Sequence, residues 1–63
     1  MYQYWLLQYI SCEGNNRWTI IRSLDVQKDD VITMIPLGGC GDDISEIISV
    51  DESSDNNYSI DLT

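Results

Sequence analysis

The chain of 63 residues has room for a single small domain, which we expect to span residues 1–63. Its formal net charge is −8, and so acidic a surface repels nucleic acid and anionic lipid while it attracts basic proteins. We therefore expect the chain to bind neither nucleic acid nor membranes directly, and we expect its partner to be a basic protein.

The N-terminal segment predicts a β-hairpin. Residues 2–11, YQYWLLQYIS, have the aromatic and aliphatic composition of a strand that is buried on much of both faces. Residues 12–16, CEGNN, supply turn chemistry, and residues 17–23, RWTIIRS, form the returning strand. We expect Trp5 and Trp18 to pack in the core of this hairpin.

The apolar run in the first strand also bears on location. It is too short to cross a bilayer, lacks a basic flank and is interrupted by Gln3 and Gln8. We therefore expect neither a membrane span nor a signal peptide. We expect the protein to be cytoplasmic.

A helix is expected over residues 25–35, with Ser23 or Asp25 as its cap and Pro36 as its stop. Asp29 and Asp30 would lie near the N-terminal end of the helix dipole, where negative charge is favourable. The alternative is a strand at VITMI, residues 31–35, because three of its five residues are β-branched.

Two further strands are expected after the GGCG connector. Residues 44–50, ISEIISV, predict the third strand, with Ile48 and Val50 on one face and Ile47 on the other. After a turn at DESSDNN, residues 58–62, YSIDL, predict a short fourth strand. The expected fold class is α+β, with an antiparallel sheet and one helix in the order ββαββ. An all-β small barrel is the alternative.

The residues with reactive side chains predict no enzyme, no cofactor and no metal site. Without histidine, a zinc site built on Cys12 and Cys40 would lack two ligands, so we expect two free thiols, with a single disulfide as the alternative. The paired acids Asp29–Asp30 and Asp42–Asp43 are sequence neighbours whose side chains diverge, so neither pair forms a natural catalytic dyad.

Charge is distributed unevenly along the chain. Residues 1–28 carry two acids and three bases, a net charge of +1, whereas residues 29–63 carry nine acids and no base. The acids of the second half cluster in the connector, at the ends of the third strand and in the turn that follows it. We expect these acids to bind the partner: Asp42, Asp43, Glu46, Asp51, Glu52 and Asp55.

The run RSLDVQKDDVITMIPLGGCGDDISEIISVDE resembles the middle of many small phage and mobile-element proteins. In those proteins a strand leads through a serine-containing cap into a helix, and a glycine connector returns to an Ile/Val strand. With its acidity, the chain is similar to small phage-encoded inhibitors of host defence, the anti-CRISPR proteins and DNA mimics. The resemblance implies a stoichiometric inhibitor in the host cell cytoplasm that binds a basic, nucleic-acid-binding protein or complex.

A second class of function fits the same composition. The protein would then be an acidic structural or assembly module that acts through protein–protein contacts, including homodimer formation, and its charge would serve only solubility.

Overall fold

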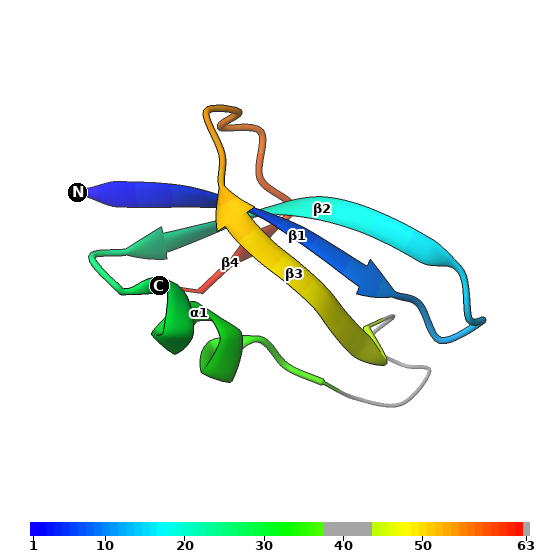
Figure 1. Cartoon of the computed structure of the whole chain (residues 1–63). Coiled ribbons are helices and arrows are strands. Elements are labelled where there is room, and N and C mark those ends of the chain that lie inside the picture. The colour runs from blue at the N-terminus through cyan, green and yellow to red at the C-terminus, as the bar shows by residue number, and fades with distance from the viewer. Residues whose placement is uncertain (38–43, 63) are drawn as a thin grey trace.

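The computed structural model describes residues 1–37 and 44–62, which form four strands and one helix. These elements are β1 (Tyr2–Ile10), β2 (Asn16–Leu24), α1 (Lys28–Met34), β3 (Glu46–Glu52) and β4 (Ile60–Asp61). The strands make one sheet in the order β3-β1-β2-β4, and α1 packs beneath it (Figure 1). The molecule is therefore a small α+β protein, and the helix decides against the all-β alternative.

The predicted hairpin is confirmed, and its turn is held by Ser11. The backbone N–H of Ser11 donates to the carbonyl of Asn15 at 2.8 Å, and its hydroxyl donates to Glu13 Oε2 at 2.9 Å. This hydroxyl hydrogen bond lowers the pKa of Glu13 below its usual value of 4.5. Gly14 has a φ of 88°, which a side chain with a Cβ adopts only with strain.

The core lies between the sheet and α1. Trp5, Leu7 and Ile21 come from one face of the hairpin, and the residues that pack against them come from α1, the segments beside it and β3: Val31, Ile35, Ile44 and Val50. Inside the core, Trp5 Nε1 donates to Ser23 Oγ at 2.7 Å. The indole N–H is thereby satisfied where water cannot reach it.

The helix falls within the predicted range but does not use the predicted cap. Its N-cap is Gln27, which makes no side-chain capping hydrogen bond, so the expectation of Ser23 or Asp25 as the cap is wrong. Ser23 instead accepts the Trp5 hydrogen bond, and Asp25, at φ 47°, bonds the N-terminal amine. The helix ends before Ile35, which is extended because proline follows it.

A β-bulge changes the predicted facing of β3. Leu7 pairs with Val50, but Tyr9 pairs with Ile47, so the register shifts by one residue between Gln8 and Tyr9. Both Val50 and Ile47 consequently pack against the core, whereas Ile48 is 53% exposed. The predicted strict alternation is wrong because a bulge places two residues opposite one.

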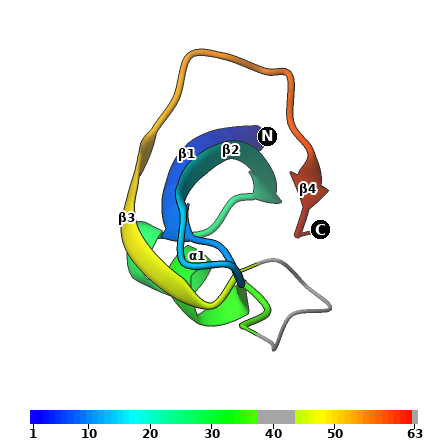
Figure 2. The ribbon, with the colours of Figure 1, turned by 90° about the vertical axis from the view of Figure 1, so that its right-hand side faces the viewer.

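The fourth strand also departs from the prediction. β4 pairs with β2 in parallel, so the sheet is mixed and the expectation of an antiparallel sheet is wrong. The segment 53–59 must cross from one edge of the sheet to the other, and it arches over the face opposite α1 (Figure 2). Along this path the Ser53 N–H donates to Tyr4 and the Ser59 N–H donates to Ile20.

The crossing segment explains why two neighbours in β2 are both buried. Ile21 faces the core, and Ile20 faces the other side, yet their exposed fractions are 0% and 4%. Trp18 shares the face of Ile20 but lies beyond the segment and is 64% exposed. The prediction of a core containing both tryptophans is therefore wrong for Trp18.

The prediction of two free thiols is also wrong, because Cys12 is disulfide-bonded. The other cysteine of the chain, Cys40, lies outside the described residues. Ser45 donates through its hydroxyl to the carbonyls of Ile10 and Ser11, so the start of the β3 segment lies close to the hairpin turn. The spacing of cysteines along the sequence does not predict such tertiary proximity.

In the part of the chain that the structure describes, no helix is long and apolar enough to span a membrane.

The core assignment predicts opposite outcomes at the two tryptophans. Trp5→Ala should destabilise the fold by about 3–5 kcal/mol, whereas Trp18→Ala should cost less than about 1 kcal/mol. Denaturant unfolding followed by circular dichroism measures both. If Trp5→Ala does not fold, Trp5→Phe, which loses the Ser23 hydrogen bond, should still show a lowered midpoint. Equal costs at both positions would contradict this core.

Candidate partner-binding surface

β3 and the segment after it position the acids that the sequence selects. Glu46 is the first residue of β3, and Asp51 and Glu52 are its last two. At about 3.3 Å per residue, Glu46 lies roughly 20 Å along the strand from Glu52. Asp55 follows in the crossing segment, on the side of Glu52. The structure therefore brings Asp51, Glu52 and Asp55 into one region and places Glu46 apart from them.

The remaining two predicted residues, Asp42 and Asp43, lie outside the described residues.

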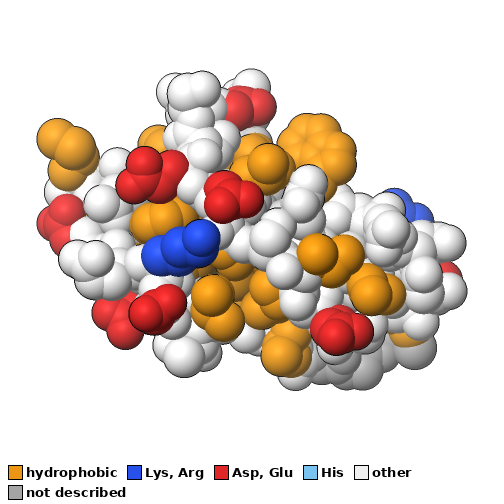
Figure 3. All heavy atoms as spheres, viewed as in Figure 1, with side chains coloured by type: hydrophobic (Ala, Val, Ile, Leu, Met, Phe, Trp, Pro, Cys, Tyr) orange, Lys and Arg blue, Asp and Glu red, His pale blue; other side chains and the backbone are white. Residues whose placement is uncertain are grey.

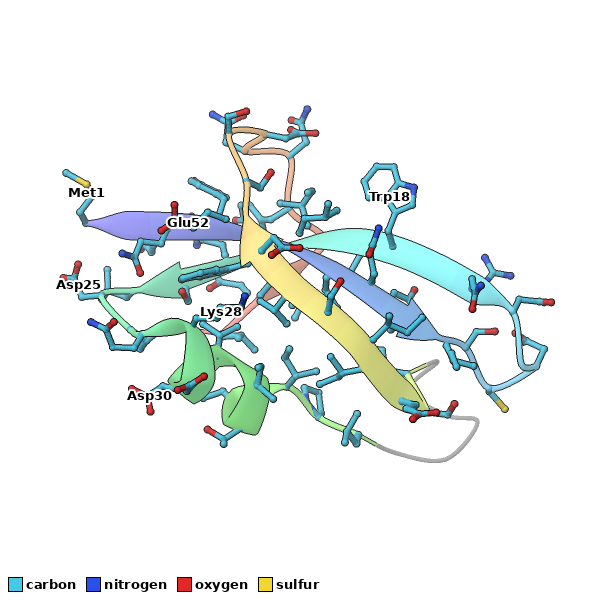
Figure 4. The ribbon with its side chains drawn as sticks, in the orientation of Figure 1. Met1, Trp18, Asp25, Lys28, Asp30 and Glu52 are labelled. Carbon is cyan, nitrogen blue, oxygen red and sulfur yellow. The ribbon has the colours of Figure 1, made fainter. Side chains whose placement is uncertain are left out.

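Asp51 is partly neutralised by the helix. Lys28 Nζ lies 3.6 Å from Asp51 Oδ1, and both side chains are more than half exposed. Figure 4 shows Lys28 reaching from α1 toward β3, between Glu52 and Asp30. An exposed pair of this kind contributes less than about 1 kcal/mol. Val50, next to Asp51, is only 1% exposed, so at this point of β3 the core residue is buried while the Asp51 and Glu52 side chains stay at the surface.

Asp55 has a local structural role besides its charge. Its carboxylate accepts the backbone N–H of Asn57 at 2.9 Å, and its own N–H donates to Ser53 Oγ at 3.0 Å. These bonds are typical of the turns that Asp and Ser stabilise. The carboxylate stays exposed, so it can still contribute to the surface potential.

The sequence-based selection missed two acids on the same side of the molecule. Asp29 and Asp30 occupy the first turn of α1, and both are exposed. Figure 3 shows acidic side chains above and below the one basic side chain near the middle of this face. The sequence held one signal for including Asp29 and Asp30 in the acidic surface, because both contribute to the negative charge of residues 29–63. Only their favourable position near the N-terminal end of the helix dipole was predicted.

Most cationic groups of the chain are already used in ion pairs with acids. Arg22 pairs with Asp61, Lys28 with Asp51, and the N-terminal amine with Asp25. Within residues 1–37 and 44–62, the acids that make no ion pair outnumber those that do: Asp29, Asp30, Glu46, Glu52 and Asp55, besides Glu13, which is held by Ser11. The acidic surface is thus largely uncompensated.

Arg22 organises an aromatic cluster on the face opposite α1. Its guanidinium lies 4.1 Å from the centre of the Tyr2 ring and 4.3 Å from that of Tyr58. The hydrogen bond to Asp61 raises the pKa of Arg22 above its usual value. Tyr58 also packs on Tyr4, with ring centres 6.1 Å apart. These contacts fasten the crossing segment to the sheet, although the buried Nε of Arg22 has no hydrogen-bond partner among the described residues.

A different surface lies at the hairpin end of the sheet. Trp18 is 64% exposed and Ile48 is 53% exposed, and both line a hollow of about 310 Å³. Gln8, Asn16 and Arg17 complete its lining. Figure 4 shows the indole of Trp18 projecting away from the sheet, so this surface is an apolar patch beside a cation.

Among the described residues, no three potential metal ligands of the Asp, Glu, Cys or His type lie together. Comparisons with protein-family models, with curated proteins and with solved structures each found no match for the chain. The function must therefore be argued from its own residues.

Proposed function

We propose that the protein is a stoichiometric, non-catalytic inhibitor that binds a basic, nucleic-acid-binding surface of a host defence complex. Its carboxylates would occupy positions where the target binds phosphates, as in a DNA mimic or an anti-CRISPR protein. The observation that carries this proposal is the uncompensated acidic surface formed by β3, the segment after it and the first turn of α1. A negative field of this kind accelerates encounter with a basic partner.

Charge mimicry also accounts for the way the acids are spread. A phosphate backbone presents negative charges at regular intervals rather than in one pocket. Glu46 and Glu52 lie roughly 20 Å apart along β3, and Asp29 and Asp30 extend the surface across α1. The acids would act through their summed potential, so no single carboxylate should dominate binding.

The proposal places the protein in the cytoplasm of a host cell, where a nucleic-acid-binding target would be. The disulfide of Cys12 argues in the other direction, because disulfides persist mainly in oxidising compartments. A cytoplasmic location is compatible with the disulfide only if the fold survives when the disulfide is reduced.

A second candidate function rests on Trp18 and Ile48. An acidic structural or assembly module would bind its partner through this exposed apolar patch, and its charge would keep the protein soluble. A homodimer through the same patch belongs to this candidate.

The two candidates predict different effects of substitution on binding to a partner captured from cell extract. Replacing Asp51, Glu52 and Asp55 together by their amides should slow association about tenfold, whereas Trp18→Ala should leave the rate unchanged. DNA or RNA should displace the partner, and association should weaken from low to physiological salt. Surface plasmon resonance measures the association rate of each variant.

The matched controls concern folding. The triple amide variant should keep or slightly raise the melting temperature, because it removes repulsion between like charges. Binding that is lost in Trp18→Ala but survives in the triple amide variant, with no dependence on salt, would contradict the inhibitor and favour the assembly module.

The cytoplasmic assignment predicts a fold that tolerates reduction. Reductant should lower the stability by about 2–5 kcal/mol, the usual effect of losing a native disulfide, yet leave the protein folded at 25 °C because Cys12 lies outside the core. Thermal unfolding with and without reductant measures this, and Cys12→Ser without reductant should match the reduced protein. Complete unfolding on reduction would place the protein in an oxidising compartment.

A further inference from the structure

Only half of β2 is paired on its outer edge. β4 pairs with Ile21 and Arg22, and a further hydrogen bond joins Ser59 to Ile20. In the described part of the chain, no strand pairs with the outer edge of residues 16–19. Figure 1 shows this half of β2 extending past β4 toward the hairpin turn. An unpaired edge presents backbone N–H and C=O groups on which another strand can form.

The hydrogen-bond pattern identifies which backbone groups point outward. The Ser11 N–H donates to the Asn15 carbonyl across the hairpin, so the backbone groups of odd-numbered β2 residues face β1. Ile20 and Arg22 accept hydrogen bonds from the β4 segment, so even-numbered residues face away from β1. By this alternation, Asn16 and Trp18 direct their backbone groups outward.

Two hollows flank this edge, and Asn16, Arg17 and Trp18 line both of them. The one described above has Gln8 and Ile48 in its lining, on the face that carries Trp18. A second, of about 280 Å³, is lined by Tyr9, Asn16, Arg17 and Trp18. Tyr9 and Arg17 are paired across the hairpin and lie on the opposite face from Gln8 and Trp18.

Strand addition uses such a combination of an open edge and flanking hollows. Backbone hydrogen bonds supply affinity, and hollows for alternate side chains supply specificity. Beside Trp18 and Ile48 the surface suits an apolar side chain. Beside Arg17 it suits a carboxylate, because Arg17 makes no ion pair within residues 1–37 and 44–62, whereas Arg22 and Lys28 do. Glu13 attracts Arg17 electrostatically but is itself hydrogen-bonded to Ser11.

A second copy of the chain fits this edge poorly. Antiparallel pairing that joins the outward groups of Asn16 and Trp18 would place Arg17 opposite Arg17 of the other copy. Like charges directly opposite each other destabilise a sheet. Each copy also carries a formal net charge of −8, so the two molecules repel each other.

The geometry points to residues 16–19 of β2 as a docking edge for an extended segment of a partner protein, in which apolar side chains alternate with carboxylates. The added strand would continue the line of β4 along β2. Its apolar side chains would cover Trp18, and its carboxylates would face Arg17. This surface is distinct from the acidic one and does not depend on the inhibitor proposal.

A five-residue peptide of alternating valine and glutamate tests the docking edge, with NMR titration of the full chain at physiological salt. The amide signals of Asn16 and Trp18 should shift. The same peptide with lysine in place of glutamate should bind this edge about tenfold more weakly, despite the net charge of the protein, because it places a cation against Arg17.

N-methylated peptides separate strand pairing from charge attraction. Methyl groups on one alternate set of peptide amides should weaken binding about tenfold, and those on the other set less than about twofold, because only one set faces β2. On the protein, Asn16→Pro removes an outward N–H and should weaken binding about fivefold beyond Asn16→Ala. Arg17→Gln should abolish the preference for glutamate over lysine.

Four results would overturn the docking edge. The first is equal binding of the two N-methylated peptides. The second is tighter binding of the lysine peptide than of the glutamate peptide, as measured by the amide signals of Asn16 and Trp18. The third is a dimer, detected by sedimentation, that Asn16→Pro dissociates, since the occupant would then be a second copy. Absence of any shift at Asn16 and Trp18 with the glutamate peptide at millimolar concentration would count equally against it.

Discussion

Burial of the β1–β2 hairpin is the constraint on which the rest of the structure depends. The hairpin is apolar on both faces, as Ile20 and Ile21 show by being buried on opposite sides. A single helix and the residues beside it cover one face, and the crossing segment 53–59 covers part of the other. In the part of the chain that the structure describes, this cover is incomplete at the hairpin end, where Trp18 is exposed and half of the outer edge of β2 is unpaired.

The same constraint distributes the charge. Apolar side chains occupy both faces of the hairpin, so the acids lie at the ends of β3, in the first turn of α1 and in the crossing segment. Two of the three basic side chains pair with acids of other elements: Arg22 fastens the crossing segment through Asp61, and Lys28 links α1 to Asp51. Self-repulsion among the remaining acids opposes the compact state, and binding to a basic partner would relieve it.

The hairpin, the helix and the region of β3 could be predicted from local patterns, because turn residues and apolar composition act over a few positions. The exposure of Trp18 could not, since it depends on where a distant segment crosses the sheet. The bulge that turns Ile47 rather than Ile48 toward the core depends on the partner strand, and the disulfide of Cys12 depends on tertiary proximity. For the acidic surface, the sequence selected Asp51 and Glu52 as neighbours at the end of the third strand. It did not add Asp30, because only the packing of α1 against β3, marked by the Lys28–Asp51 pair, brings the first turn of the helix next to that end of β3.

The central claim is that the described residues cover one face of the hairpin and part of the other, and leave residues 16–19 of β2 unpaired on their outer edge. Hydrogen exchange of the free protein, read for each amide by NMR, tests it most directly. The account predicts an alternation along one half-strand, in which Asn16 and Trp18 exchange at least about tenfold faster than Arg17 and Thr19, whose amides face β1. Equally slow exchange at all four amides would show that the edge is covered in the free protein, and equally fast exchange would show that this end of the hairpin is not formed.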